Sequence, residues 1–154
     1  MAKTAKDVFT PKNPQKYIGR NLNNIIFRSS WELAAMRLFD RHPNVLGWSS
    51  ECVDIPYINP LTNRSTIYKP DFLVIYIDKT GKQHIEVIEI KQLKEIPGYQ
   101  EISERTGKPK RLSEQTRLTQ VINAAKWKAA VAFCAKRGWK FRVATEKTLF
   151  NMGK

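Results

Sequence analysis

YKPDFLVIYIDKTGKQHIEVIEIK, residues 68–91, is the stretch of sequence that decides the fold of this chain. It contains two runs rich in Val, Ile, Tyr and Phe, residues 72–77 and 85–90, which are joined by the Gly-containing segment 78–82. β-Branched and aromatic residues on both sides of a short turn predict two antiparallel strands, so we expect a β-hairpin. The remaining segments must pack around it.

Three polar residues mark the open end of this predicted hairpin. Asp71 begins the first strand, and Glu89 and Lys91 end the second. Antiparallel pairing places the start of one strand beside the end of the next, so all three lie at one end of the sheet. Residues two apart share a face, so Glu89 and Lys91 project together, whereas Glu86 projects from the opposite face.

This arrangement predicts a metal site. Two adjacent carboxylates repel each other, and a bound divalent cation offsets that repulsion. Asp71, Glu89 and the backbone carbonyl of Ile90 supply oxygen ligands, which suit Mg²⁺, with Mn²⁺ as the expected substitute. Lys91 then lies beside the attacking water or the scissile phosphate. The predicted chemistry is metal-dependent phosphodiester hydrolysis, in which the cation lowers the pKa of a water and stabilises the developing charge.

A second interpretation of the same residues is structural. Glu89 and Lys91 can form a solvated pair at a sheet edge, and Asp71 can simply begin a strand after Pro70. The short pattern alone leaves both interpretations open.

Composition narrows the class of protein. The 154 residues include 27 Lys and Arg against 14 Asp and Glu, a net charge of +13, and this favours a polyanionic partner, above all nucleic acid. The length predicts one domain. With no long apolar run and no apolar segment near the N-terminus, we expect neither membrane insertion nor secretion. Cys52 and Cys134 are expected to be buried free thiols, and no zinc site is expected, because the two Cys and two His do not have ligand spacing.

The N-terminal residues 1–20 are predicted to form a basic arm outside the domain, which spans residues 21–154. Pro11 and Pro14 interrupt any helix there, and five cations face a single acid, Asp7. Two readings remain open: the arm contacts a phosphate backbone, or it is a tail without a role.

Residues 29–41 are predicted to form the first helix, which His42 and Pro43 end. Ser29 and Glu32 have the spacing of a capping box, in which the Glu32 side chain bonds back to the Ser29 backbone N–H. Alternatively, Glu32 points towards Asp71 and Glu89 as a third acidic ligand, directly or through water.

The other segments complete a mixed α/β fold. Residues 53–57 are predicted to form an edge strand ended by a proline, residues 112–137 a helix capped by Ser113 and stopped by Gly138, and residues 139–144 a last strand. Residues 92–110 form a long loop placed to wrap a duplex or to be a mobile insertion. The cations expected to contact DNA are Arg20, Arg28, Lys94, Lys108, Lys110, Arg111 and Lys126.

Glu32, Pro70-Asp71 and Glu89-Ile90-Lys91, in this order of elements, resemble the PD-(D/E)xK nuclease superfamily over residues 25–146. The segments GRNLNNIIFRSSWE, YKPDF and IEIK are similar to those of head completion nucleases of large tailed bacteriophages. The layout SSWE, PDF, EIK, W and TE is also similar to that of TnsA-type transposon endonucleases.

The resemblance implies a restriction-endonuclease-like mixed sheet flanked by helices, and Mg²⁺-dependent cleavage of DNA. Asp71 and Glu89 would ligate the metal, Lys91 would orient the water, and Glu32 would complete the site. A further Gln or Lys from the following helix has two candidates, Gln115 and Lys126.

The resemblance to the phage proteins also implies a role in finishing the DNA-filled head. The expected partners are DNA and the head, portal or neck proteins, and the expected location is the infected host cytoplasm or the virion. A homodimer is expected if both strands are cut. The alternatives are a non-enzymatic protein that binds the DNA end and, more weakly, an RNase.

Overall fold

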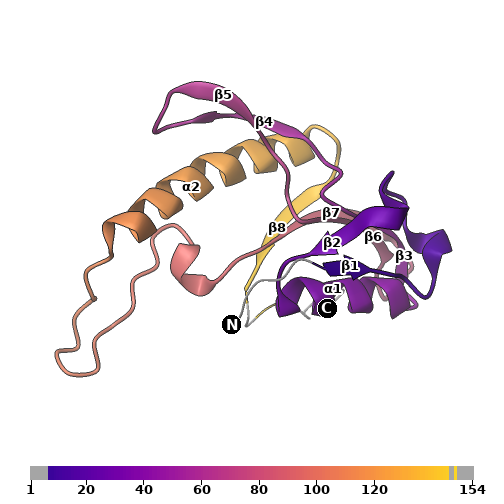
Figure 1. Ribbon diagram of the computed structural model, residues 1–154, viewed down its shortest axis with the longest axis horizontal. Helices are drawn as coiled ribbons and strands as arrows, with labels where there is room; N and C mark the ends of the chain where they lie inside the picture. Colours follow the sequence, from indigo (N-terminus) through magenta and orange to yellow (C-terminus); the bar gives the residue numbers. More distant parts are fainter. Residues whose placement is uncertain (1–6, 146–147, 149–154) are drawn as a thin grey trace.

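A mixed four-stranded sheet forms the centre of the computed structural model, which describes residues 7–145 and 148 (Figure 1). The strand order is β3 (Val45–Ser50), β6 (Phe72–Ile77), β7 (Gln83–Ile90) and β8 (Lys140–Ala144). The first three are antiparallel neighbours, and β8 runs parallel to β7. The fold is therefore α/β with a mixed sheet flanked by helices, as the sequence predicts.

The predicted hairpin is β6 and β7, with Phe72 opposite Ile88. Its turn is closed by the Asp78 carboxylate, which accepts bonds from the backbone N–H groups of Thr80 and Lys82. Gly81 has a φ of 85°, a conformation that residues with a Cβ rarely adopt. The turn residues and the apolar pattern of the strands thus both specify a hairpin, which explains why the sequence alone predicts the pairing of β6 with β7.

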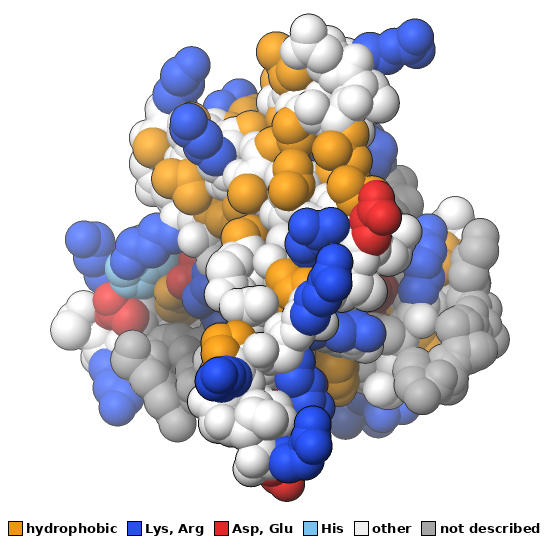
Figure 2. Space-filling view, turned by 90° about the vertical axis from the view of Figure 1, so that its left-hand side faces the viewer, with side chains coloured by type: hydrophobic (Ala, Val, Ile, Leu, Met, Phe, Trp, Pro, Cys, Tyr) orange, Lys and Arg blue, Asp and Glu red, His pale blue; other side chains and the backbone are white. Residues whose placement is uncertain are grey.

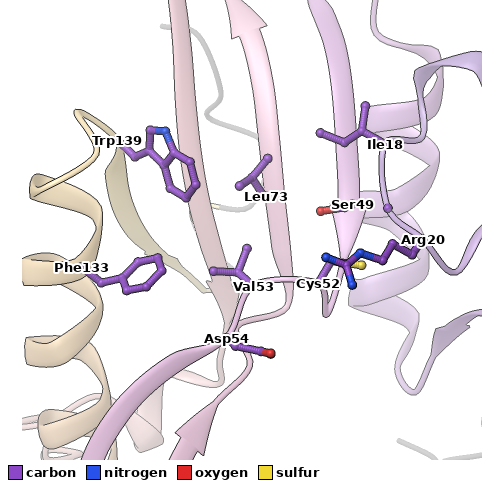
Figure 3. A pocket seen from close by; sticks show the side chains of 10 residues that line it. Ile18, Arg20, Ser49, Cys52, Val53, Asp54, Leu73, Phe133 and Trp139 are labelled. Carbon is purple, nitrogen blue, oxygen red and sulfur yellow. The ribbon is translucent and has the colours of Figure 1, made fainter.

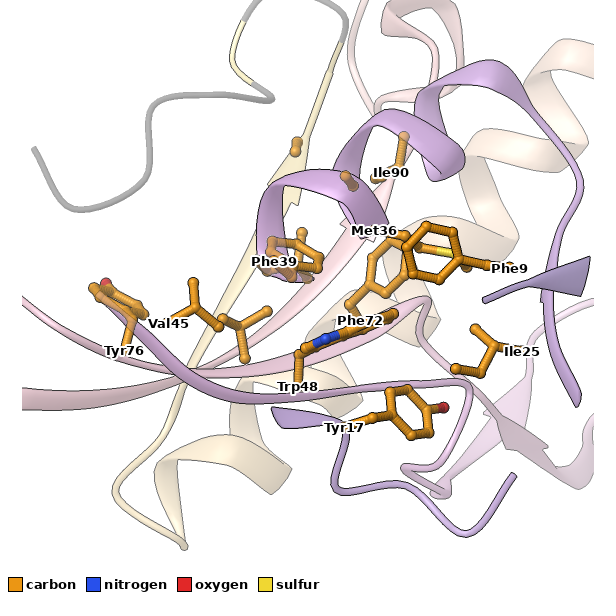
Figure 4. Close-up of a cluster of buried hydrophobic side chains, with 14 residues drawn as sticks. Phe9, Tyr17, Ile25, Met36, Phe39, Val45, Trp48, Phe72, Tyr76 and Ile90 are labelled. Carbon is orange, nitrogen blue, oxygen red and sulfur yellow. The ribbon is translucent and has the colours of Figure 1, made fainter. Parts of the chain in front are cut away.

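Helix α1 (Ser30–Arg41) covers one face of the sheet. Trp48, Phe39 and Phe72 are almost completely buried there, and their rings meet at tilted or edge-to-face angles (Figure 4). The Ser29 hydroxyl caps α1 by accepting from the Glu32 N–H, as predicted. The Glu32 carboxylate, however, returns to the N–H of Arg28, not to that of Ser29.

Helix α2 (Glu114–Ala135) lies over the opposite face. It begins two residues later than expected and is capped by Ser113, which accepts from the Thr116 N–H. Gly138, with a φ of 73°, follows its end as predicted. Its residue Cys134 is buried as expected, whereas Cys52 is exposed, so the expectation of two buried thiols is wrong for Cys52.

A separate hairpin packs on α2 (Figure 1). It consists of β4 (Ile55–Asn59) and β5 (Arg64–Tyr68), with Ile55 opposite Tyr68. The predicted edge strand is confirmed, but it continues through Pro56 instead of ending there. Proline is tolerated at this position because β4 has only one partner strand.

The described part of the predicted N-terminal arm, from residue 7 onwards, packs onto the domain. β1 (Asp7–Phe9) pairs with β2 (Ile25–Phe27), and Phe9 joins the core beside Trp48. Two 3-10 turns, η1 (Pro14–Lys16) and η2 (Leu22–Asn24), connect these strands. The buried Asp40 carboxylate accepts from the N–H groups of Lys12 and Asn13 and so holds this segment on α1.

The predicted loop after β7 starts with the 3-10 turn η3 (Leu93–Glu95) and projects away from the sheet before α2 begins (Figure 1). Within the described ranges, neither helix is long and apolar enough to cross a membrane.

Candidate active site

Asp71 and Glu89 meet at the open end of the β6–β7 hairpin, as the sequence predicts. The Glu89 carboxylate accepts from the Asp71 N–H at 3.2 Å, and the Asp71 carboxylate accepts from the Ile90 N–H at 2.8 Å. Each acid is thus hydrogen-bonded to the other strand's backbone. This reciprocal arrangement fixes two carboxylates on the sheet face that α2 covers.

Lys91 stands next to this pair. Its ammonium nitrogen lies 3.5 Å from one Glu89 oxygen and 3.9 Å from a carboxylate oxygen of Glu95 on η3. The Lys91 backbone N–H is bonded to the Ala144 carbonyl of β8, so its position is set by the sheet. Glu86 lies on the opposite face, paired with Arg142 at 3.0 Å, which confirms the predicted alternation.

The environment favours the protonated forms of the two acids when no cation is bound. Burial and the neighbouring Glu89 charge raise the pKa of Asp71 well above its ordinary value. Burial also raises the pKa of Glu89, although Lys91 partly offsets this. Two enclosed carboxylates with raised pKa values are a common feature of sites that bind a cation or transfer a proton.

Glu32 reaches this site from the first turn of α1. Burial is the main cause that raises the pKa of Glu32, and the charges of Glu51 and Glu89 raise it further. One carboxylate oxygen accepts from the Arg28 N–H at 3.1 Å, so Glu32 acts as a helix cap within electrostatic range of the acidic pair. Arg28 also pairs with Glu51 at 2.9 Å.

Three aromatic and basic residues complete the site, and two of them were not expected from the sequence. Tyr68, at the end of β5, places a buried hydroxyl beside Glu89, and Trp127, on α2, places a buried indole N–H beside that hydroxyl. Burial and the nearby Glu89 charge raise the pKa of Tyr68. Lys126 lies over the Tyr68 ring, 5.4 Å from its centre.

Lys126 is the candidate for the additional residue from the following helix. Burial and the charge of Lys91 lower the pKa of Lys126, while Glu89 and Asp71 counteract this. It is therefore close to Asp71, Glu89 and Lys91. The other candidate, Gln115, is exposed in the first turn of α2.

The donor set fits a magnesium ion that keeps several waters. Mg²⁺ is usually held by one or two carboxylates, and Asp71 and Glu89 provide two on one face. Among residues 7–145 and 148, no group of three or more His, Cys, Asp or Glu side chains forms a metal cluster. Ligation by Glu32, directly or through water, therefore remains a prediction, as does ligation by the Ile90 carbonyl. The buried Tyr68 hydroxyl, which lies beside Glu89, is a further polar group at the site.

The remaining predicted DNA contacts fall into two groups. Lys94, Lys108, Lys110 and Arg111 are exposed on the segment between β7 and α2, on the side where α2 begins. Figure 2, which views this side, shows Lys and Arg side chains gathered over the projecting loop and the region above it. Arg20 lies apart from them.

Arg20 lines a separate open cavity of about 330 Å³ between the N-terminal segment and the end of α2 (Figure 3). Leu73, Phe133 and Trp139 form its apolar wall, and Arg20 and Asp54 lie at its rim. None of Asp71, Glu89 or Lys91 lines this cavity, so it is distinct from the candidate active site.

Comparison with known proteins gives two matches. Residues 42–146 match the family described as "TnsA-like endonuclease N terminal", a range that contains Asp71, Glu89, Lys91 and Lys126. The chain is also similar to the head completion nuclease of Enterobacteria phage T4, with 35% identity over 147 residues, which cover 94% of this chain and 93% of the relative. No solved structure matches the chain.

Proposed function

This chain belongs to the family of TnsA-like endonuclease N-terminal domains and is an endonuclease, and from this premise we propose that it cleaves DNA with the help of Mg²⁺ during completion of a phage head. The family membership and the T4 relative support the reaction class and the biological step. The proposal adds the cofactor, the residues that hold it and the DNA substrate.

One observation carries the proposal: the reciprocal bonding of Asp71 and Glu89 beside Lys91. Holding two repelling carboxylates together destabilises the protein unless a cation joins them, so this arrangement points to a function. When bound, Mg²⁺ would supply Lewis-acid stabilisation of the charge that develops on the phosphate.

The side chains of the site would bind the cation and position the substrate. Asp71 and Glu89 hold the cation, and Lys91 holds the scissile phosphate and keeps its own charge close to the reacting oxygen atoms. Lys126 adds a second positive charge from α2. Glu32 fixes the start of α1 and would contribute negative charge near the same acidic pair.

Plasmid cleavage tests these assignments. We expect the wild-type chain to nick or linearise supercoiled plasmid with Mg²⁺ or Mn²⁺ and to be inactive with EDTA. Asp71→Asn, Glu89→Gln and Lys91→Ala should each lower the rate by at least about 100-fold, the size typical for removing a group that acts in the transition state.

Glu86→Gln is the matched control, because Glu86 is also a buried carboxylate of β7 but faces away from the site. It should retain most of the activity. Cleavage by all three site variants at the wild-type rate would rule out the assigned residues, and loss of activity in Glu86→Gln alone would place the site on the other face.

The location and assembly partners follow from the phage role. We propose that the protein acts in the infected host cytoplasm or in the virion and meets head, portal or neck proteins there. A second copy of the chain is required if one event cuts both strands, and sedimentation with and without DNA measures this.

A further inference from the structure

We propose that residues 99–113 form a cationic arm that binds duplex DNA outside the candidate active site. This inference rests on the proposed DNA substrate and names the surface that would hold it. The arm is the part of the chain that projects from the domain between η3 and α2 (Figure 1).

The arm is a short hairpin with defined backbone bonding. Ile102 pairs with Pro109 in an antiparallel bridge, and the N–H groups of Ser103 and Lys110 donate across the hairpin to the carbonyls of Lys108 and Glu101. Two strands of about six residues each reach roughly 20 Å from the domain. These bonds define the path of the backbone and place the charges of the arm on a projection beside the site.

Two buried amides anchor the base of the arm on α2. Gln120 donates to the carbonyls of Lys94 and Tyr99, and Asn123 donates to the carbonyl of Glu95. Both amides are almost fully buried. Because Glu95 also lies beside Lys91, the same contacts connect the arm to the active site.

The charges of the arm fit a phosphate backbone. Arg105, Lys108 and Arg111 are exposed and have no ionic side-chain partner among the described residues, whereas Lys110 pairs with Glu101. Figure 2 shows Lys and Arg side chains dominating this projection. No core residue lies on the arm, so its charges do not serve packing.

The shape and the aromatic residues favour duplex over single-stranded DNA. A two-stranded ribbon fits the major groove of B-DNA, about 12 Å wide. Proteins that bind single strands stack bases on exposed aromatic rings. In the described part of this chain every aromatic residue is buried or half-buried, and the large hydrophobic residues that are exposed are all aliphatic. The arm therefore offers charge and shape but no stacking surface.

Binding measured without divalent cations tests the arm independently of cleavage. The probe is a fluorescent blunt duplex about three helical turns long, compared with one of its single strands, titrated at about 50 to 200 mM NaCl. The wild-type chain should bind the duplex more tightly. The double variant Arg105→Ala, Lys108→Ala should bind it at least about tenfold more weakly and give a salt slope lower by about 1.8, because each phosphate contact contributes about 0.9.

Lys79→Ala, Lys82→Ala is the matched control, since it removes two exposed cations from the tip of another hairpin, β6–β7. The control should keep the wild-type salt slope. The arm is ruled out if the arm variant keeps that slope, if both double variants lose it equally, or if the single strand binds as tightly as the duplex. Failure of the proposed nuclease function would instead appear as absence of plasmid cleavage.

Discussion

Asp71, in the bend just before β6, and Glu89, in β7, show how a hairpin can place two side chains. Each accepts a hydrogen bond from the backbone of the neighbouring strand, so sheet formation itself brings the carboxylates together. Their separation is therefore as rigid as the hairpin. A site built in this way tolerates little movement of either acid, and conservative substitutions should affect cation binding before they affect folding.

The raised pKa values of this pair predict how stability depends on pH. In the unfolded chain both acids lose their protons near pH 4. In the folded, metal-free chain burial raises the pKa of Asp71 and of Glu89, so the folded state holds protons that the unfolded state has lost. Their contribution to the free energy of unfolding therefore declines as pH rises above about 4 towards the folded pKa values.

Magnesium should reverse this loss because it binds the deprotonated carboxylates. We expect Mg²⁺ to raise Tm more at about pH 8 than at about pH 5.5, measured by thermal unfolding against EDTA at each pH. Asp71→Asn should abolish the difference, whereas Glu86→Gln should preserve it. An equal Mg²⁺ effect at both pH values would contradict the shared cation.

At the scale of the elements, Gln120 of α2 holds the base of the arm in place. Its side-chain amide donates hydrogen bonds to two backbone carbonyls there. Gln120→Ala leaves both carbonyls without that donor, which typically costs about 1–3 kcal/mol locally. We expect hydrogen exchange of the amides in residues 94–110 to be at least about fivefold faster, because this cost lowers the opening energy of the arm.

Gln115→Ala is the control, because Gln115 is exposed on the same helix and its side chain makes none of these bonds. Exchange in the β6–β7 hairpin should be unchanged in both variants. Equal acceleration throughout the chain would mean that Gln120 stabilises the whole domain and does not act on the arm.

The helices and strands also show which parts of the fold can be predicted from the sequence. The β6–β7 hairpin, α1, α2 and β8 were predictable because local periodicity, caps and turn residues define them. β3 was missed because its sequence, VLGWSS, contains a glycine and two buried serines and lacks apolar alternation. β1, β2 and β5 were missed because strands of three to five residues depend on partners far along the chain.

The residues of the candidate active site likewise divide into those that local sequence predicts and those that depend on distant contacts. Asp71, Glu89 and Lys91 follow from strand alternation and hairpin geometry, which a sequence contains. Tyr68 and Trp127 join them only because β4–β5 packs on α2, and nothing local distinguishes these two rings from ordinary core residues.

At the scale of the whole molecule, the N-terminal segment packs against the core of the domain, whereas its basic composition had suggested an extended arm. Phe9 and Tyr17 belong to the main core, and the Tyr17 hydroxyl accepts from the Ser50 N–H. A chain beginning at Asn21 should therefore lose at least about 4 kcal/mol of unfolding free energy, since each buried aromatic contributes roughly 2–3 kcal/mol. Urea denaturation followed by tryptophan fluorescence measures the loss.

The paired experiment is Ile18→Ala in the full chain, because Ile18 is exposed by 52% and its loss should have little effect. If the shortened chain unfolded at the same urea concentration as the full chain, the segment would be a dispensable arm, and the predicted boundary at residue 21 would be correct.

The parallel pairing of β7 with β8 also has a consequence for the order in which the site is assembled during synthesis. β7 is flanked by β6 on one side and by β8 on the other, and the Lys91 N–H bonds to the Ala144 carbonyl. The ribosome delivers Ala144 long after it has delivered Lys91. During translation β7 is therefore the edge strand of a three-stranded sheet until β8 has been made, and the acidic pair lies at that edge. The backbone of Lys91 therefore gains its partner on β8 only after the end of the domain has been synthesised.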